Sequence, residues 1–215
     1  MTVPVAQTHA ELMDDVYRWQ RHFYDVTRKY YLLGRDRTIR GMELPEHGSM
    51  LEIGCGTGRN LALAQRMWPD AALFGLDISP EMLKTATARL DGRAVLAAGD
   101  AARFDAASLF GRDTFDRVML SYCTSMIPQW ERAVTQACGL VGPGGSLHII
   151  DFGTMAQMPG WLRRGLGAWL ARFHVTPRGS LCASAFATGA KHGLAGEVRE
   201  GPGGYYQVIV LRRSG

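Results

Sequence analysis

The chain has 215 residues, 47% of them hydrophobic and 20% charged, so it is long enough to bury a core and fold as one domain. Its four cysteines are scattered, which argues against a zinc site or a disulfide framework and indicates reduced thiols in a cytoplasmic protein without a metal. The N-terminus lacks the apolar core of a signal peptide, and no apolar run is long enough to cross a bilayer.

The net charge of +4 is unevenly distributed. Residues 50–151 carry nine basic and eleven acidic side chains, whereas residues 152–215 carry eight basic and two acidic ones, a net +6. Of the 24 basic residues, 21 are arginine. The C-terminal third therefore suits an anionic partner, such as a phospholipid surface, a nucleic acid or a carboxylate-bearing substrate. An ordinary solvated basic surface is the alternative.

The N-terminal segment is expected to be helical. Leu12, Val16, Trp19 and Phe23 recur at 4-3-4 spacing, which predicts one amphipathic helix over residues 9–24. A second helix is predicted from Thr27 to about Arg40, and we expect residues 1–47 to form a helical lid.

The stretch from Leu51 to Gly58 is the most informative motif. An apolar run ends in Glu52, and glycines follow at alternate positions before a helical segment. Such a strand, tight turn and helix start lets the backbone approach a ligand and offers unpaired N–H groups. Cys55, inside this loop, is interpreted as a small residue in a tight turn rather than a nucleophile.

Strands and helices then alternate, which predicts a parallel sheet covered on both faces. The predicted strands are 49–53, 72–77, 94–98, 115–121 and 145–151, and the predicted helices are 58–68, 80–90, 105–110 and 129–141. Beyond them we expect a helix at 158–173 and strands at 193–200 and 204–213.

Acidic residues end two of these strands. Asp77 ends the second strand, 23 residues after Gly54, where a carboxylate can accept hydrogen bonds from ribose hydroxyls, and Asp100 follows the third. A dinucleotide fingerprint would place its third glycine at position 59, which is Arg59 here, so the spacing weighs against a dehydrogenase. From about residue 50 to 152 the chain resembles class I S-adenosylmethionine (SAM) methyltransferases.

This resemblance implies a Rossmann-like α/β fold with a seven-stranded, mostly parallel sheet and helices on both faces. Residues 48–152 would be the SAM-binding core and residues 153–215 a substrate- or membrane-facing part. Asp77 would hold the ribose, Ile78 would pack on the adenine, and Asp100 and Ala101 would bind the adenine edge, although Asp100 is also a candidate helix cap. The implied cofactor site comprises Tyr24, Glu52, Gly54, Cys55, Gly56, Gly58, Asp77, Ile78, Asp100, Ala101 and Ser121.

The end of the fourth strand departs from one methyltransferase pattern. Enzymes that methylate planar base nitrogens often carry Asn/Asp-Pro-Pro-Tyr there, whereas this chain has Ser121-Tyr122-Cys123-Thr124. Together with the lack of a recognisable RNA-binding module, this argues against a nucleic-acid partner.

The flanks carry a second resemblance. The segments 21–36, 151–153 and 169–178 look like those of bacterial betaine-lipid N-methyltransferases, which methylate the amine of diacylglyceryl-homoserine three times. The resemblance implies a lipid head-group amine as substrate. The alternatives are a phosphatidylethanolamine N-methyltransferase, a small-molecule methyltransferase and a SAM-binding accessory subunit without activity.

A head group of this kind has an amine that becomes a permanent cation and a carboxylate. Aromatic faces attract such cations, and arginine binds carboxylates with two hydrogen bonds. We therefore expect an aromatic cage from Tyr24, Tyr30, Tyr31 and Tyr122, and a carboxylate partner in Arg28 or Arg178. His174 or Tyr122 would accept the amine proton, with structural roles for all of these residues as the alternative.

The predicted helix at 158–173 has two readings. Leu162, Leu166, Trp169 and Phe173 recur on one face, with Arg163, Arg164 and Arg172 elsewhere around it. Such a helix can lie in a membrane interface, which would make the protein peripheral at the inner membrane surface. The alternative, which the need for a connection before the sixth strand favours, is a crossover helix packed on the sheet.

Overall fold

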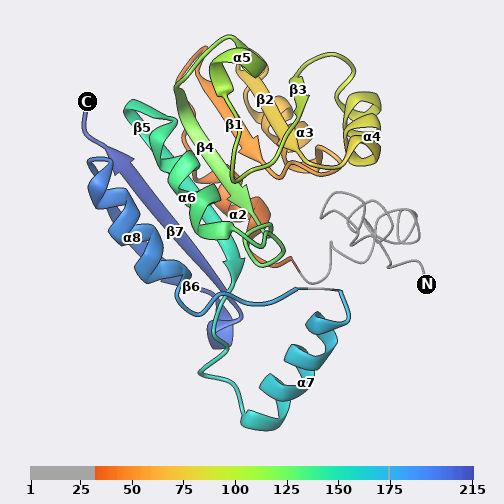
Figure 1. Ribbon diagram of the computed structural model, residues 1–215, viewed down its shortest axis with the longest axis vertical. Coiled ribbons are helices and arrows are strands. Elements are labelled where there is room, and N and C mark those ends of the chain that lie inside the picture. The colour runs from red at the N-terminus through yellow and green to blue at the C-terminus, as the bar shows by residue number, and fades with distance from the viewer. Residues whose placement is uncertain (1–31, 174) are drawn as a thin grey trace, which may run out of the picture.

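The computed structural model describes residues 32–173 and 175–215, and its central feature is a seven-stranded sheet (Figure 1). The strand order is β3-β2-β1-β4-β5-β7-β6, in which β7 runs antiparallel to both of its neighbours and all other pairs are parallel. The strands are β1 (Ser49–Ile53), β2 (Ala72–Asp77), β3 (Val95–Ala98), β4 (Phe115–Ser121), β5 (Val141–Phe152), β6 (Leu194–Glu200) and β7 (Tyr206–Arg213).

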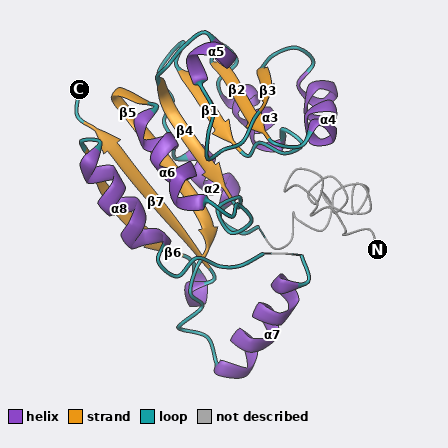
Figure 2. Ribbon diagram, in the orientation of Figure 1, coloured by secondary structure: helices purple, strands orange, loops and turns teal. Residues whose placement is uncertain are grey.

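Helices cover both faces of this sheet (Figure 2). In Figure 1, α6 and α8 lie in front of the sheet, and α2 and α3 lie behind it. The helices are α2 (Arg35–Arg40), α3 (Arg59–Met67), α4 (Pro80–Leu90), α5 (Ala106–Phe110), α6 (Trp130–Gly139), α7 (Gly160–Ala171) and α8 (Leu181–Lys191), with a short 3-10 turn, η1 (Pro202–Gly204). This is the predicted Rossmann-like fold with its mostly parallel seven-stranded sheet.

Apolar side chains fill the space on each side of the sheet. On one face, the rings of Phe74, Phe110 and Phe115 meet edge to face with centroids 5.2–6.3 Å apart. On the other, Phe152 packs between Tyr122 and Tyr205 at centroid distances of 4.9 and 5.7 Å. Strands buried on both faces are typical of a parallel sheet, and all five residues of β1 are buried.

The structure corrects the prediction for the segment after β5. The helix that packs on α6, β6 and β7 is α8, which the sequence reading did not predict. Its sequence, LCASAFATGAK, is rich in small residues and has little contrast between faces, so its periodicity is weak. The prediction that residues 158–173 form the crossover helix on the sheet was therefore wrong. Helix α7 lies apart from the sheet in Figure 1 and only its Leu170 is buried, although Leu166 and Trp169 are partly buried against the same core cluster.

Two boundaries also differ from the prediction. β5 begins at Val141 instead of residue 145, and a register shift against β4 accommodates the glycine-rich stretch that was expected to be only a turn. Helix α2 begins at Arg35, directly after Gly34 in the left-handed region at φ 77°. The predicted helix at 9–24 lies outside the described residues.

Candidate functional site

The carboxyl ends of β1 to β4 meet at one edge of the sheet. Because β1 pairs with both β2 and β4, the loop after β1 lies between Asp77 at the end of β2 and Ser121 at the end of β4. In open parallel sheets, ligands bind at such a point, where the strand order reverses.

The glycine loop is held by the backbone of β2. The N–H groups of Gly54 and Cys55 both donate to the carbonyl of Leu76, at 2.7 and 2.9 Å. Gly54, Gly56 and Gly58 all have positive φ, at 74°, 53° and 72°. A Cβ at Gly54 would meet Cys123 at 2.9 Å and one at Gly58 would meet Leu90 at 3.0 Å, whereas one at Gly56 would meet nothing within 4 Å. Gly56 is thus the point at which a ligand can approach the loop.

Asp77 fixes that loop from the neighbouring strand. Its carboxylate accepts hydrogen bonds from the N–H of Gly56 at 2.7 Å and of Ser79 at 3.0 Å. Only 8% of Asp77 is exposed. The loop conformation therefore depends on a carboxylate 21 residues further along the chain. Ile78 follows as a half-buried residue beside the loop.

The ends of β3 and β4 complete this edge. The Asp100 carboxylate accepts from the N–H of Ala102 at 2.9 Å in a local turn, and no helix begins there, so Asp100 is not the helix cap that the sequence offered as its alternative role. Ala101 is buried beside it, at 9% exposure. The buried Ser121 hydroxyl at the end of β4 has no hydrogen-bond partner among the described residues. A buried polar atom without a partner is uncommon and is consistent with a site that a ligand completes.

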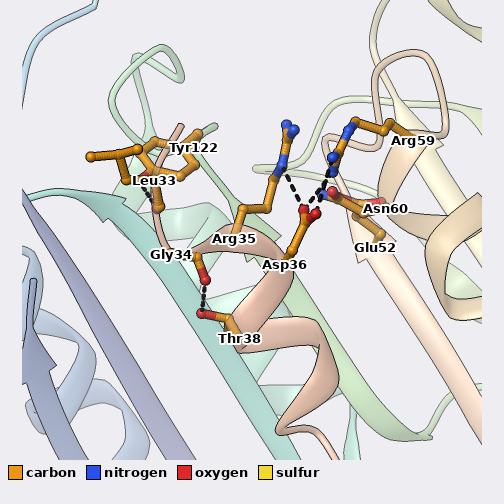
Figure 3. Close-up of polar contacts among 9 residues, drawn as sticks. All are labelled: Leu33, Gly34, Arg35, Asp36, Thr38, Glu52, Arg59, Asn60 and Tyr122. Atoms are coloured by element: carbon orange, nitrogen blue, oxygen red, sulfur yellow. Dashed lines mark hydrogen bonds and ion pairs between the residues drawn. The ribbon is translucent and has the colours of Figure 1, made fainter. Parts of the chain in front are cut away.

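Glu52 is buried beneath the loop, beside Asn60 of α3 (Figure 3). The Asn60 Nδ2 donates to Glu52 Oε1 at 2.5 Å, while Glu52 Oε2 and Asn60 Oδ1 have no partner among the described residues. Burial raises the pKa of Glu52 to about 8, although the bond from Asn60 opposes the shift. Burial therefore favours the neutral form of Glu52, and a cation or a hydrogen-bond donor that reached the carboxylate would favour the charged form.

An ion pair joins the start of α3 to α2 and was not anticipated from the sequence. Arg59 donates to both carboxylate oxygens of Asp36, at 2.6 and 3.1 Å, and this contact lowers the pKa of Asp36 (Figure 3). Arg35, buried at 8% exposure, lies beside them. The positive charges of Arg35 and Arg59 act on Glu52 and favour its charged form, against the effect of burial. Neither a motif nor a periodicity marks Asp36 or Arg35, so only the folded chain reveals this arrangement.

Tyr122 does not have the role that the sequence suggested. Its ring is buried against Phe152, its φ is 52°, and its hydroxyl donates to the carbonyl of Leu33 at 2.5 Å. Burial raises its pKa well above the ordinary value for tyrosine. These contacts correct the expectation that Tyr122 faces the head group as a cage residue or proton acceptor: it ties the segment before α2 to the end of β4.

Arg178 is likewise occupied by the protein. Its guanidinium donates from Nε to the carbonyl of Thr124 at 3.2 Å and from Nη2 to that of Ile127 at 3.1 Å. The same loop is held by Asp151, which accepts from Thr124 Oγ1 and from the N–H of Ser125. Arg178 therefore fastens the segment after α7 to the loop after β4, which corrects its expected role as the carboxylate partner.

The remaining expected substrate and cofactor residues lie outside the described residues. These are Tyr24, Arg28, Tyr30, Tyr31 and His174. Their roles stay predictions. Within the described ranges, no group of three or more His, Cys, Asp or Glu side chains could hold a metal ion, and no helix is long and apolar enough to cross a membrane.

The strand order, the glycine loop and the acidic strand ends together define a class I methyltransferase fold. A solved structure of phosphoethanolamine N-methyltransferase 2 from Haemonchus contortus, in complex with phosphomonomethylethanolamine and S-adenosylhomocysteine, has the same fold, with a TM-score of 0.74 at 15% identity over 99% of this chain and 62% of that one. Residues 50–145 match the family described as "Methyltransferase domain". Residues 50–145 are thus similar to methyltransferase domains, and they lie in the part of a class I methyltransferase fold that holds the glycine loop and the acidic strand ends.

Two curated relatives are similar over that region. Trans-aconitate 2-methyltransferase of Methylobacterium radiotolerans is 32% identical over 56% of this chain and 45% of its own length. Phosphatidylethanolamine N-methyltransferase of Cereibacter sphaeroides is 31% identical over 48% of this chain and 50% of its own length. The chain therefore spans about half the length of these relatives.

Proposed function

We propose that this protein is a SAM-dependent N-methyltransferase that acts on the amine of a lipid head group from the membrane surface. The acceptor that we propose is diacylglyceryl-homoserine, which would become the trimethylated betaine lipid. The observation that carries the lipid assignment is helix α7, which follows the carboxyl end of β5, next to the cofactor edge, and lies apart from the sheet (Figure 1).

The surface of α7 has the composition of an interfacial helix. Trp161 is 71% exposed, and the neighbouring Arg163 and Arg164 are also exposed. No acidic residue occurs between residues 152 and 196, whereas this stretch contains four arginines and a lysine. Tryptophan partitions into the head-group region, and arginine is attracted to anionic lipid at about 1 kcal/mol per charge. These properties support contact with an anionic membrane.

The chemistry requires positioning more than acid–base assistance. SAM supplies an electrophilic methyl group, which passes from sulfur to nitrogen in an in-line displacement. The glycine loop and Asp77 would fix the nucleoside and methionine parts, with Glu52 near the ammonium end. The acceptor nitrogen must be neutral, so its proton leaves for water or for a side chain before transfer. Tyr122 is unsuited to take that proton because its hydroxyl is bonded to Leu33.

Phosphatidylethanolamine is the second candidate acceptor. The relative from Cereibacter sphaeroides is named for that activity. Arg178, a proposed carboxylate partner of homoserine, is bonded to backbone carbonyls instead. Both acceptors present a primary amine on a diacyl lipid, and they differ in carrying a carboxylate or a phosphate.

Labelled SAM with defined vesicles tests the proposal. Wild-type protein is incubated with vesicles that contain either diacylglyceryl-homoserine or phosphatidylethanolamine, and the lipids are separated. Label in the betaine lipid is the expected result, and label only in methylated phosphatidylethanolamine would establish the second candidate. SAM binding by calorimetry without any labelled lipid would refute a lipid acceptor, and the Asp77→Ala variant serves as the control for cofactor-dependent labelling.

A further inference from the structure

A groove lined by arginines runs along the outer seam between α3 and α4. It has a volume of about 760 Å³ and is lined by Arg59, Ala62, Gln65, Arg66, Pro69, Arg89, Leu90, Asp91 and Arg93. Four of the lining residues are arginines and one is acidic. Two of these arginines also have structural contacts near the site described above, because Arg59 pairs with Asp36 of α2 and Arg89 donates to Thr57 of the glycine loop.

The concentration of positive charge is unusual for this part of the chain. Residues 50–151 contain nine basic and eleven acidic residues, so the segment as a whole is negatively charged. Four of those nine basic residues line this one groove. A random scatter of surface charge would place several acidic residues among them, yet Asp91 is the one acidic residue among the described residues that line the groove.

The local structure explains how the arginines converge. Arg59 and Arg66 are seven residues apart on α3 and therefore share a face, with Ala62 between them as a small residue that leaves the groove hollow. Arg89 comes from the last turn of α4, and Arg93 follows that helix. The buried side chain of Leu90 forms part of the groove floor.

The four guanidinium groups differ in their hydrogen bonds and ion pairs within the protein. Arg59 is paired with Asp36, and Arg89 donates from Nη1 to the carbonyl of Thr57 at 2.9 Å and to its hydroxyl at 2.7 Å. Arg93 lies 3.1 Å from the Gln65 amide, whose oxygen accepts from it in the orientation that satisfies both groups. Arg66 is exposed and has no hydrogen bond or ion pair with any residue of the described ranges. Arg66 and Arg93 are thus the two most available to a ligand.

We propose that this groove binds a phosphate-bearing anion with more than one negative charge, held chiefly by Arg66 and Arg93. Arginine, with a planar fork of donors, binds phosphate oxygens through paired hydrogen bonds, and all four basic lining residues are arginine rather than lysine. The anion is either a soluble phosphorylated compound or the head group of an acidic phospholipid. The proposal depends neither on methyl transfer nor on the contact of α7 with lipid.

Calorimetry with inorganic pyrophosphate, at constant ionic strength set with potassium chloride, tests the site on the full chain. We expect saturable binding to the wild type and a loss of at least about tenfold in affinity for the Arg66→Gln/Arg93→Gln double variant, because two charge-assisted contacts disappear. The Arg66→Lys/Arg93→Lys variant should retain part of the affinity. The Arg163→Gln/Arg164→Gln variant of α7 removes the same charge elsewhere and should bind pyrophosphate as the wild type does.

Vesicles that contain phosphatidic acid distinguish the two sources of the anion. The Arg66→Gln/Arg93→Gln substitutions are added to the protein that already carries Arg163→Gln/Arg164→Gln. If the ligand is a lipid head group, this fourfold variant should bind the vesicles more weakly than the α7 variant does. If the ligand is a soluble compound, the two proteins should bind the vesicles equally. SAM affinity, measured for each variant, reports that the fold is intact. No heat with pyrophosphate for the wild type, or equal affinity in the groove and α7 variants, would overturn the proposal, whatever the methyl acceptor proves to be.

Discussion

The loop after β1 and helix α7 follow the carboxyl ends of two strands of the same sheet but are held in opposite ways. The loop is fixed by two backbone bonds to Leu76 and by the Asp77 carboxylate, and its strand is fully buried. Helix α7 buries one side chain, Leu170, and exposes a tryptophan and its arginines. The element that we assign to the cofactor is thus built into the core, whereas the element that we assign to the acceptor is attached at the periphery.

Among substitutions that test the contrast between the glycine loop and α7, Asp77→Ala should have the largest effect on stability and on SAM affinity. The substitution leaves the part-buried N–H of Gly56 and the buried N–H of Ser79 without their acceptor, and the loss of an acceptor for a buried group destabilises by about 1–3 kcal/mol. Urea unfolding should show that decrease, and calorimetry should show SAM affinity reduced by at least about 1.5 kcal/mol. Asp105→Ala is the matched control, because Asp105 accepts from the N–H of Ala107 at the exposed start of α5. Equal SAM affinity in both variants would show that Asp77 does not organise the site.

Glu52→Gln should change how stability depends on pH. The folded-state pKa of about 8 lies above the ordinary 4.5, so between these pH values the unfolded chain loses the proton while the folded protein keeps it. The Glu52 contribution therefore lowers wild-type stability as pH rises through this window, by at most about 1.4 kcal/mol per pH unit. The variant keeps an acceptor for Asn60 and lacks this slope.

Urea unfolding of both proteins between pH 5 and pH 8 measures this difference. The comparison with the variant is needed because His148 also makes stability depend on pH. Burial lowers the pKa of His148 to about 3, so its contribution to the unfolding free energy rises with pH below pH 6.5, opposite in sign to that of Glu52. Parallel pH profiles for the two proteins would show that Glu52 is ionised in the folded state.

Tyr122→Phe should have a smaller effect on stability, and it tests whether the Tyr122 hydroxyl acts as a general base. The substitution removes the hydrogen bond to Leu33 and keeps the ring against Phe152, so a loss of about 1 kcal/mol of unfolding free energy is expected. Single-turnover transfer should remain close to that of the wild type. A decrease of about a hundredfold, typical for loss of a general base, would contradict the structural role that we assign to this hydroxyl.

The sequence predicted the tightly held half of the molecule well and the loosely held half poorly, for a physical reason. From Ser49 to Phe152, each strand contains a short apolar run, and the loop requires glycine at positive φ, so local patterns carry the information, apart from the glycine-rich start of β5. Helix α8, by contrast, packs on α6 and is rich in small residues. Small residues give little hydrophobic periodicity, so the sequence did not predict this helix. Tyr122 and Arg178 were assigned from residue type, but their partners, Leu33 and the carbonyls after β4, are distant in sequence. Hydrogen bonds between residues so far apart in the chain cannot be predicted from the spacing of residues in the sequence.

Trp161→Ala should have almost no effect on stability and a clear effect on membrane binding. Trp161 is 71% exposed, so its removal should change the unfolding free energy by no more than about 0.5 kcal/mol. If its ring enters the lipid interface, the loss of apolar burial should weaken binding to anionic vesicles at least about tenfold, equivalent to the lower part of the 1.5–3 kcal/mol range for a large apolar side chain. Val198→Ala, which removes an exposed apolar side chain on the edge strand β6, is the control.

Methyl transfer to vesicle lipid should fall in the tryptophan variant, while transfer to a short-chain, water-soluble lipid analogue should not. Equal losses on both acceptors would mean that Trp161 acts at the catalytic edge itself, and the contrast between a core-bound cofactor and a peripheral acceptor element would then disappear.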